Sequence, residues 1–316
     1  MDIESVCILG GSGFVGRAVT DQLSGQGLRV RVVTRSRPRA MPLAVLPTVE
    51  LVVADAHDTV SLARCFEGMD AVVNLVGILH ERRSQTFQAC HVELPRKVVE
   101  ACHSAGVRQL LHMSALGASE SGPSRYQRSK GAGEAELRRT ADGLAYTILR
   151  PSVVFGEGDD FLNKFALLAR WFPVIPLAGA RTRFQPIWVE DVARCFAGAL
   201  GNPRAFGNAY EICGPKQYTL EELVRYVAGL GGRNPRVVPL SGALASLQAA
   251  VLEVLPGPPM TRDNLASMSV DNICSQPFPA IFGFDPAPLE VIAPVYLAGG
   301  GLARARYPRF RHTAGR

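Results

Sequence analysis

Residues 3 to 16 read Ile3-Glu-Ser-Val-Cys-Ile-Leu-Gly-Gly-Ser-Gly-Phe-Val-Gly16, and this stretch decides the fold that we expect. Its apolar run from Val6 to Leu9 predicts a strand that is buried on both faces of a parallel sheet. The stretch from Phe14 to Leu23 then places its apolar residues on one face of a helix. A strand, a glycine-rich turn and a helix in this order predict a dinucleotide site.

The three glycines of the turn are spaced three residues apart, and each has a distinct predicted role. Gly10 permits the tight turn, and Gly13 lets the backbone approach a pyrophosphate. Gly16 lets the helix pack closely on the strand, while the helix N-terminus supplies free N–H groups and partial positive charge. A glycine-rich turn without a ligand is the alternative, and the flanking strand and helix favour the cofactor.

Length and composition indicate a globular α/β protein. The 316 residues allow one large domain with an elaborated second lobe, or two domains. The apolar fraction of 47% supports a real core, and the charged fraction of 20% argues against disorder. Met1 lies two residues before Ile3, so we expect no targeting presequence, and no run of eighteen apolar residues predicts a membrane span.

The net charge of +6 comes mostly from the end of the chain. Residues 301–316 carry five arginines and no acid, which leaves about +1 on the rest of the sequence. We therefore expect no nucleic-acid partner. We interpret 301–316 as a basic flexible tail, with anionic lipid or an acidic partner as the alternative reading.

The seven cysteines are scattered and form no Cys-x-x-Cys pair, which is typical of small buried residues in a reducing, cytoplasmic compartment. The pairs Cys90-His91 and Cys102-His103 suggest a metal site at first sight. Twelve helical residues would separate the two pairs by about 18 Å, too far for one ion. We therefore expect no metal site.

Five further strands are predicted at 29–34, 49–54, 71–75, 109–114 and 144–149, with helices between them. This alternation predicts a doubly wound parallel sheet of Rossmann type over residues 1–150. Residues 151–300 are expected to form a smaller α/β lobe for a substrate or partner, with a strand and helix at 184–200 returning to the first domain. Within that lobe, 242–255 is apolar almost all round, so we expect it to be buried rather than to lie in an interface or on a membrane.

The residues after the second strand indicate the cofactor. Arg35, Arg37 and Arg39 follow it with no acid among them, which favours the 2′-phosphate of NADP(H) over the bare ribose of NAD(H), although NAD(H) stays possible. A solvated basic loop is the alternative. At the end of the third strand, Asp55 is expected to bond the adenine amino group, unless Asp55 or Asp58 caps the next helix.

Tyr126 and Lys130 stand one helical turn apart and carry the predicted chemistry. An ammonium beside a phenol lowers its pKa from about 10 toward the working range, and the same ammonium can hold a ribose. The strand ending at Ser114 brings a hydroxyl to the same edge of the sheet, where it would bond a substrate oxygen.

These motifs resemble the short-chain dehydrogenase/reductase superfamily. Leu149-Arg-Pro-Ser-Val-Val-Phe-Gly156 and Pro186-Ile-Trp-Val-Glu-Asp191 are similar to its extended branch, the NAD-dependent epimerases and dehydratases of nucleotide sugars. His91-Val-Glu-Leu-Pro95, Ser114-Ala-Leu-Gly117 and Met260-Thr-Arg-Asp-Asn264 are similar to an atypical subgroup. That subgroup contains the Rossmann-type accessory subunit of respiratory complex I and its bacterial relatives.

The resemblance implies Tyr126 as the acid/base, Lys130 as its activator and Ser114 as the polarising hydroxyl. His91 stands where the extended enzymes have asparagine, so their proton relay does not carry over. The residues expected to bind the cofactor are Gly10, Ser12, Gly13, Phe14, Val15, Gly16, Arg35, Arg37, Asp55, Ala56, Asn74, Val76, Gly77, Lys130 and Pro151.

Three functions follow from these motifs. The first is an oxidoreductase that uses NADP(H) and the Tyr/Lys pair on a carbonyl or alcohol of an apolar, quinone-related substrate. The second is a non-catalytic accessory protein that holds NADPH for respiratory complex I or quinone synthesis, peripheral to the inner membrane. The third is a nucleotide-sugar epimerase or dehydratase. Fold and motif do not by themselves separate these functions.

Overall fold

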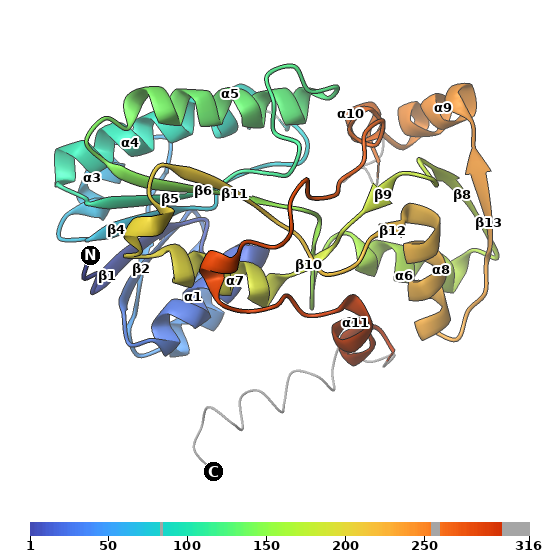
Figure 1. The fold of residues 1–316 in the computed structure, drawn as a ribbon, viewed down its shortest axis with the longest axis horizontal. Helices are drawn as coiled ribbons and strands as arrows, with labels where there is room; N and C mark the ends of the chain where they lie inside the picture. Colours follow the sequence, from blue (N-terminus) through green and yellow to red (C-terminus); the bar gives the residue numbers. More distant parts are fainter. Residues whose placement is uncertain (83–84, 254–259, 299–316) are drawn as a thin grey trace, which may run out of the picture. The chain divides into compact units, whose positions relative to one another are not determined.

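The computed structural model has at its centre a parallel sheet with the strand order β11-β6-β5-β4-β1-β2-β3 (Figure 1). The order reverses between β1 and β4, and ligands of open α/β sheets bind at the carboxyl ends of such strands. The strands are β1 (Ser5–Leu9), β2 (Arg29–Thr34), β3 (Val49–Val53), β4 (Ala71–Asn74), β5 (Gln109–Met113), β6 (Ala145–Pro151) and β11 (Asn208–Ile212). The predicted doubly wound α/β fold is therefore confirmed.

The structure describes residues 1–82, 85–253 and 260–298, and these form two compact units. Unit 1 comprises Met1–Ser152, Val189–Cys213 and Cys274–Asp285, and it contains the whole central sheet. Unit 2 comprises Val153–Trp188, Gly214–Ile273 and the chain from Pro286 onwards. The tail predicted at 301–316 lies outside the described residues.

Helices cover both faces of the sheet in unit 1. Helices α1 and α7 lie together on one face, and α3, α4 and α5 lie on the other (Figure 1). Fully buried apolar side chains fill the second of these layers, including Leu9, Val98 and Leu110. The helices of unit 1 are α1 (Phe14–Gly25), α2 (Arg37–Ala40), α3 (Thr59–Phe66), α4 (Leu94–Ala105), α5 (Arg125–Thr140) and α7 (Val189–Ala199), with short turns η1 (Met41–Val45), η2 (Gln88–Glu93), η3 (Pro203–Ala205) and η4 (Ala280–Phe282).

Several local signals in the sequence place these helix ends. Gly106 has φ 69° and ends α4, as its freedom to adopt a left-handed conformation predicts. Asp58, rather than Asp55, caps α3 by accepting hydrogen bonds from the N–H groups of Val60 and Ser61. In unit 2, Thr219 and Glu222 form a capping box at the start of α8, as the spacing of these two residue types predicts.

Unit 2 is built from helices and paired short strands. Its core is apolar, with Leu162, Leu223 and Val224 almost fully buried. Its helices are α6 (Leu162–Trp171), α8 (Leu220–Leu230), α9 (Gly242–Glu253), α10 (Arg262–Ser267) and α11 (Leu289–Leu297). Its strands pair as β7 (Val154–Phe155) with β10 (Ile187–Trp188), β8 (Val174–Ala178) with β13 (Arg236–Leu240), and β9 (Arg183–Phe184) with β12 (Tyr218–Thr219).

Three expectations about these elements are wrong. The strand expected at the start of 184–200 is two short strands, β9 and β10, which pair with different partners within unit 2. Helix α9 buries only small residues such as Ala245 and Ala249, while Leu244, Leu247 and Val251 are more than half exposed. A helix that is apolar all round therefore presents its larger side chains to the surface of its unit, contrary to the expected burial.

The cysteines are the third correction. Cys213 and Cys274 form a disulfide, with their Cα atoms 6.0 Å apart, at two of the points where unit 1 is joined to the rest of the chain. The other five cysteines are free and buried, as expected of small core residues.

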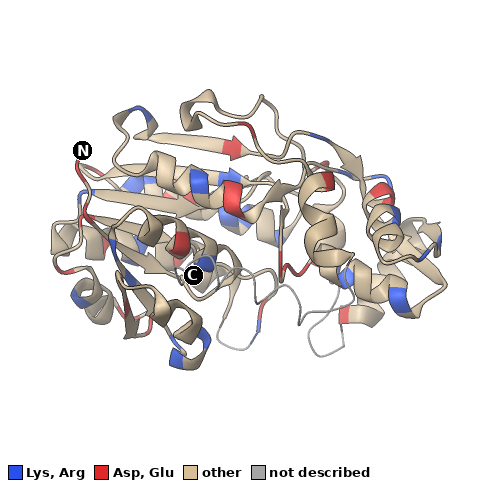
Figure 2. Cartoon of the chain, turned by 90° about the horizontal axis from the view of Figure 1, so that it is seen from below, with Lys and Arg blue, Asp and Glu red and all other residues tan. Residues whose placement is uncertain are grey.

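Charge is spread along the chain. Acidic and basic positions are interspersed over the helices and strands in Figure 2. In the described residues no helix is long and apolar enough to cross a membrane.

Candidate functional site

The glycine-rich turn between β1 and α1 is shaped by close backbone contacts. Gly10 has φ +80°, and its carbonyl accepts a 2.9 Å hydrogen bond from the N–H of Gly13. A Cβ atom on Gly16 would lie 2.2 Å from the carbonyl oxygen of Gly10 and 2.6 Å from the Cα of Gly11. The helix therefore approaches the turn as closely as the sequence predicts, and only glycine fits at position 16.

The N-terminus of α1 suits an anion. Gly13 is the N-cap of the helix and, among the described residues, no side chain caps it; Phe14 and Val15 begin the first turn, which contains no acid. Arg17, which the sequence analysis missed, donates from Nε to the carbonyl of Ser12 at 3.1 Å and places a cation beside the turn. Open N–H groups, bare backbone and a neighbouring guanidinium fit the diphosphate of a dinucleotide.

Hydroxyl groups and a guanidinium gather where β2 ends. The hydroxyls of Ser12 and Thr34 lie 3.2 Å apart. Arg35 is exposed, and its Nη2 donates to the side-chain oxygen of Gln85 at 2.8 Å when that amide is oriented to accept. Arg37 lies on α2 and is also exposed. With no acid at this strand end, the site fits a 2′-phosphate beside Arg35 better than a bare ribose.

The ends of β3 and β4 carry three of the residues predicted to bind the cofactor, Asp55, Ala56 and Asn74. Asp55 and Ala56 lie in the loop after β3, and the Asp55 carboxylate accepts from the N–H of His57 at 3.0 Å. Asn74 is fully buried; its side-chain oxygen accepts from the N–H of Val76 at 3.1 Å, and its Nδ2 lies 3.2 Å from Nδ1 of His112. Asn74 therefore shapes the turn that leads to Gly77 and does not present its side chain to a ligand.

A π-helical turn, η2, brings His91 into the site. Its Nε2 accepts from the N–H of Ile78 at 3.0 Å, so Nδ1 carries the proton and donates to the Ser129 hydroxyl at 2.8 Å. That hydroxyl donates in turn to the carbonyl of Tyr126 at 2.8 Å. Burial, with smaller contributions from Lys130 and His112, lowers the pKa of His91 to about 2, so the ring stays neutral and both of its nitrogens are occupied.

Tyr126 lies in the first turn of α5 within an aromatic cluster. Its ring meets His91 edge to face at a centroid distance of 5.6 Å and meets Phe87 at 6.0 Å. The side chain is half-buried, and burial raises the pKa of its phenol to about 12. The predicted lowering of this pKa by Lys130 is therefore wrong for the protein without its cofactor. At neutral pH the phenol carries its proton.

Lys130 lies one turn further along α5, and its ammonium is directed toward Gly77 in the loop after β4. The side chain is buried, and Nζ donates to the carbonyl of Met113 at 3.3 Å. A Cβ atom on Gly77 would lie 3.1 Å from this Nζ. The ammonium has three N–H donors, and no other hydrogen bond or ion pair links it to a described residue. This buried, under-satisfied cation fits the hydroxyls of a ribose.

Ser114 follows β5 as predicted, but its hydroxyl is enclosed. The side chain is 2% exposed, and Oγ has no hydrogen-bond partner of ordinary geometry among the described residues. It lies against the carboxylate of Glu134 closely enough to contribute to the pKa of that group. The Ser114 hydroxyl is therefore enclosed beside Glu134.

The predicted site residues thus converge within unit 1, at the carboxyl ends of its parallel strands. Pro151 ends β6, and its carbonyl accepts from the N–H of Leu116 in the loop that follows Ser114. Sequence reasoning missed Arg17, Gln85 and Glu134. The sequence could have indicated Glu134, because this residue continues the four-residue spacing of Tyr126 and Lys130 along one helix face.

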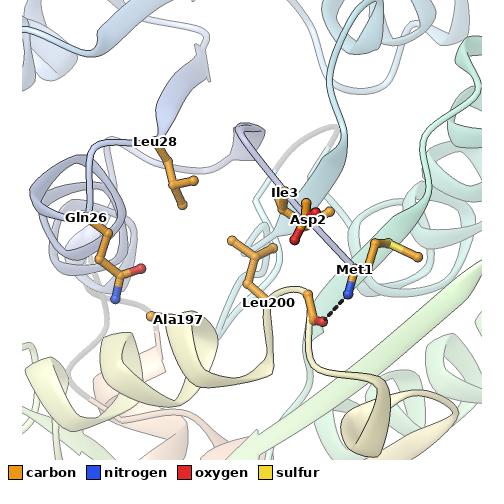
Figure 3. Close-up of a pocket in the computed structure, with 8 residues that line it drawn as sticks. Met1, Asp2, Ile3, Gln26, Leu28, Ala197 and Leu200 are labelled. Carbon is orange, nitrogen blue, oxygen red and sulfur yellow. Dashed lines mark hydrogen bonds between the residues drawn. The ribbon is translucent and has the colours of Figure 1, made fainter.

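A hollow at the opposite edge of the sheet is not part of this site. It measures about 240 Å³ and is lined by residues before β1 and β2, such as Ile3 and Leu28, and by Leu200 after α7 (Figure 3). The amino group of Met1 closes one side by donating to the carbonyl of Gly201 at 3.0 Å. Amino-terminal strand ends are not where open α/β sheets bind their ligands.

Comparison with known proteins gives a consistent picture. Residues 10–164 match a family described as NAD(P)H-binding. Mitochondrial subunit 9 of the NADH dehydrogenase (ubiquinone) 1 alpha subcomplex from Rattus norvegicus is 32% identical over 293 residues, which cover 90% of this chain and 77% of the relative. A ceramide reductase from Caulobacter vibrioides is 33% identical over 243 residues, which cover 74% of this chain and 73% of that enzyme.

Solved structures agree on the fold. An NADPH-dependent quinone oxidoreductase from Escherichia coli, in complex with NADPH, superposes with a TM-score of 0.74 over 91% of this chain and 98% of that one. At 20% identity this likeness shows the fold alone.

Proposed function

The chain belongs to the NAD(P)H-binding Rossmann-type family, within the atypical short-chain dehydrogenases/reductases, and from this premise we propose that it is an NADP(H)-dependent reductase of a carbonyl on an apolar substrate. One observation carries the proposal. The buried ammonium of Lys130 donates to one carbonyl, that of Met113, and lies beside Gly77, one turn along α5 from Tyr126. A buried cation with so few protein partners adds little to folding stability, but it can bind the hydroxyls of a ribose and the oxygen of a reacting carbonyl.

Within this proposal the residues divide the work. The glycine-rich turn and Arg17 hold the diphosphate, Arg35 holds the 2′-phosphate, and Lys130 holds the ribose hydroxyls next to the nicotinamide. The reduced nicotinamide, when bound, supplies the hydride to the carbonyl carbon. Tyr126 then gives the proton from its hydroxyl to the carbonyl oxygen, for which its raised pKa keeps it protonated.

The proposed substrate class rests on the relatives and on the character of the site. The name of the Caulobacter relative, ceramide reductase, identifies a lipid substrate for that enzyme. Phe87 and Tyr126 give this edge of unit 1 an aromatic lining, which suits an apolar carbonyl compound, a quinone-related one included.

The test is turnover of Tyr126→Phe measured alongside NADPH binding. We expect the variant to lose at least about a hundredfold in kcat on an apolar carbonyl substrate, because the proton donor is gone. Its Kd for NADPH should stay within about twofold. Tyr146→Phe on β6 is the matched control and should change neither quantity. Undiminished turnover by Tyr126→Phe would show that this phenol does not donate the proton.

A second candidate function is a non-catalytic, NADPH-holding accessory or assembly protein for respiratory complex I or quinone synthesis. The identity with the mitochondrial NADH dehydrogenase subunit favours it, as does the direction of Lys130 toward Gly77 and Met113 rather than toward the phenol. Such a protein would work at the cytoplasmic side of the inner membrane with a respiratory partner. Gentle isolation from the native cell separates the two, since the accessory protein returns with partner subunits and NADPH but has no carbonyl reductase activity. A nucleotide-sugar epimerase or dehydratase is the third candidate, and conversion of a nucleotide sugar with tightly held cofactor is its test.

A further inference from the structure

The helix that carries Tyr126 and Lys130 continues to a buried carboxylate that the predicted mechanism does not use. Tyr126, Lys130 and Glu134 are spaced four residues apart on α5, so they share one face of that helix. Lys130 is 6% exposed and Glu134 is 1% exposed. A buried carboxylate needs a reason, since its desolvation is costly and an apolar residue of similar volume is often as stable.

Glu134 is held in place by two arginines. Arg150 on β6 binds it in a bidentate manner, from Nε at 2.7 Å and from Nη2 at 2.6 Å. Arg138, one turn further along α5, donates to it at 2.9 Å. Both guanidinium groups reach toward solvent, with side chains 25% and 39% exposed, whereas the carboxylate lies inside. Solvent therefore screens the cations more than it screens Glu134.

The surroundings of Lys130 favour loss of its charge. His91 on η2 and His112 on β5 face it as neutral rings, the Cys90 thiol lies near it, and Tyr126 is protonated. It is burial that lowers the pKa of Lys130, to about 8. The carboxylate of Glu134 and, to a smaller extent, Cys90 act to raise it.

We propose that Glu134 is a positioning residue of the nucleotide site, whose buried carboxylate, on the same face of α5, acts as the counter-ion of Lys130 and keeps the ammonium beside Gly77 charged. This inference rests on the proposed function for its purpose, but not for its test. Arg150 anchors the carboxylate to the sheet, so that the charge of Lys130 is set by the framework of unit 1 rather than by solvent. Loss of Glu134 would leave two guanidinium groups without their carboxylate and Lys130 without its counter-ion.

Lysine NMR tests the proposal directly on the protein alone. The chain has four lysines, Lys97, Lys130, Lys164 and Lys216, so labelling at lysine Cε gives four resonances, and Lys130→Arg assigns the one of interest. We expect the midpoint of Lys130 near pH 8 in the wild type and lower by about one unit or more in Glu134→Gln. Glu136→Gln is the matched control, because Glu136 also pairs with an arginine on α5 but is outside the Lys130 environment; it should leave the midpoint unchanged.

Two further variants separate positioning from stability. Glu134→Asp retains the charge and should keep the midpoint near that of the wild type. Glu134→Gln combined with Arg150→Met removes the less exposed of the two unpaired guanidinium groups, so it should recover part of the stability while the Lys130 midpoint stays low. The double variant also carries the test if the single variant does not fold. A wild-type midpoint in the double variant, or in a folded Glu134→Gln, would overturn the proposal.

NADPH binding by the same proteins distinguishes this inference from the proposed function. We expect the affinity of Glu134→Gln for NADPH to fall with rising pH at the lowered Lys130 midpoint. If the midpoint shifts as expected but no variant, wild type included, binds NADPH, then the counter-ion role stands and the proposed function fails. If NADPH binds and the midpoint does not shift, the proposed function stands and the role of Glu134 fails.

Discussion

Gly16→Ala is the sharpest test of how the glycine-rich turn works. The added methyl would lie 2.2 Å from the carbonyl oxygen of Gly10, where ordinary contact begins at 3.4 Å, so the turn must retreat by about 1.2 Å. The obstacle is backbone rather than a flexible side chain, so the strain cannot be relieved by a rotamer change. Overpacking of this kind costs about 1–3 kcal/mol of folding free energy.

The same retreat should weaken the nucleotide site. Moving the turn takes its N–H groups out of reach of a diphosphate, and each hydrogen bond to a charged group contributes about 1.5–3 kcal/mol. One lost bond therefore predicts a fall in NADPH affinity of about ten- to a hundredfold. Urea unfolding measures the first effect, and a fluorescence titration with NADPH measures the second.

Gly25→Ala is the matched control for this prediction. It is the same substitution in the same helix, and a Cβ atom at Gly25 meets nothing within 4 Å. We expect it to leave the NADPH affinity unchanged and to stabilise the protein by up to about 1 kcal/mol through helix propensity. The reasoning is refuted if Gly16→Ala binds NADPH within twofold of the wild type and unfolds at the same urea concentration.

Three other predictions address the cofactor preference, the disulfide and acid stability. Arg35→Ala should reduce the preference for NADPH over NADH by about tenfold or more, while Arg39→Ala on α2 should leave it unchanged; equal loss of both affinities in competition titrations would contradict this role. Cys213→Ser opens a loop that spans 61 residues, so it should lower the free energy of unfolding by up to about 4 kcal/mol. A reductant should lower the free energy of unfolding of the wild type equally and should not change that of the variant. Burial alone would raise the pKa of Asp70, but hydrogen bonds from Glu4, Arg108 and Ser5 hold this pKa at about 2. The contribution of Asp70 to the free energy of unfolding is therefore complete above pH 4 and is lost as the pH falls toward 2. After discounting for solvent screening, Asp70→Asn should remove about 1 kcal/mol at neutral pH and flatten the acid limb of stability; an unchanged acid limb would show that these bonds contribute nothing.

The sequence predicts unit 1 well where the signal is local. Runs such as Val6–Leu9 are apolar because parallel strands are covered on both faces of the sheet. The strand ends where this run ends, at Leu9. The placement of Gly106 in the left-handed region and the side-chain caps of Asp58 and Thr219 depend only on neighbouring backbone, so they follow from the sequence.

Prediction fails where the outcome depends on distant partners. The apolar composition of 242–253 identifies a helix, but its burial depends on which elements pack against it, and Leu247 and Val251 are left exposed. Cys213 and Cys274 meet because the chain returns to unit 1 after leaving it, a fact that no spacing of cysteines conveys.

The candidate site shows the same division. The four-residue spacing places Tyr126 and Lys130 on one face of α5, yet the expected lowering of the phenol pKa fails. The ammonium is instead directed at Gly77 and the Met113 carbonyl, because η2 and β5 pack around it. Sequence spacing fixes the face of a helix, whereas the path of a long side chain depends on the walls around it.

The position of β11 has a consequence for synthesis of the chain. Strand β11 pairs with β6, but about 60 residues separate the end of one from the end of the other. At about 5–20 residues per second, a ribosome needs about 3–12 s to synthesise the chain from β6 to the end of β11. During this time β6 is an unpaired edge strand. Helix α7, which packs on α1, arrives in the same interval. A gene fragment that stops at residue 150 would therefore yield a product with one bare sheet margin and one uncovered helix, and we expect it to aggregate.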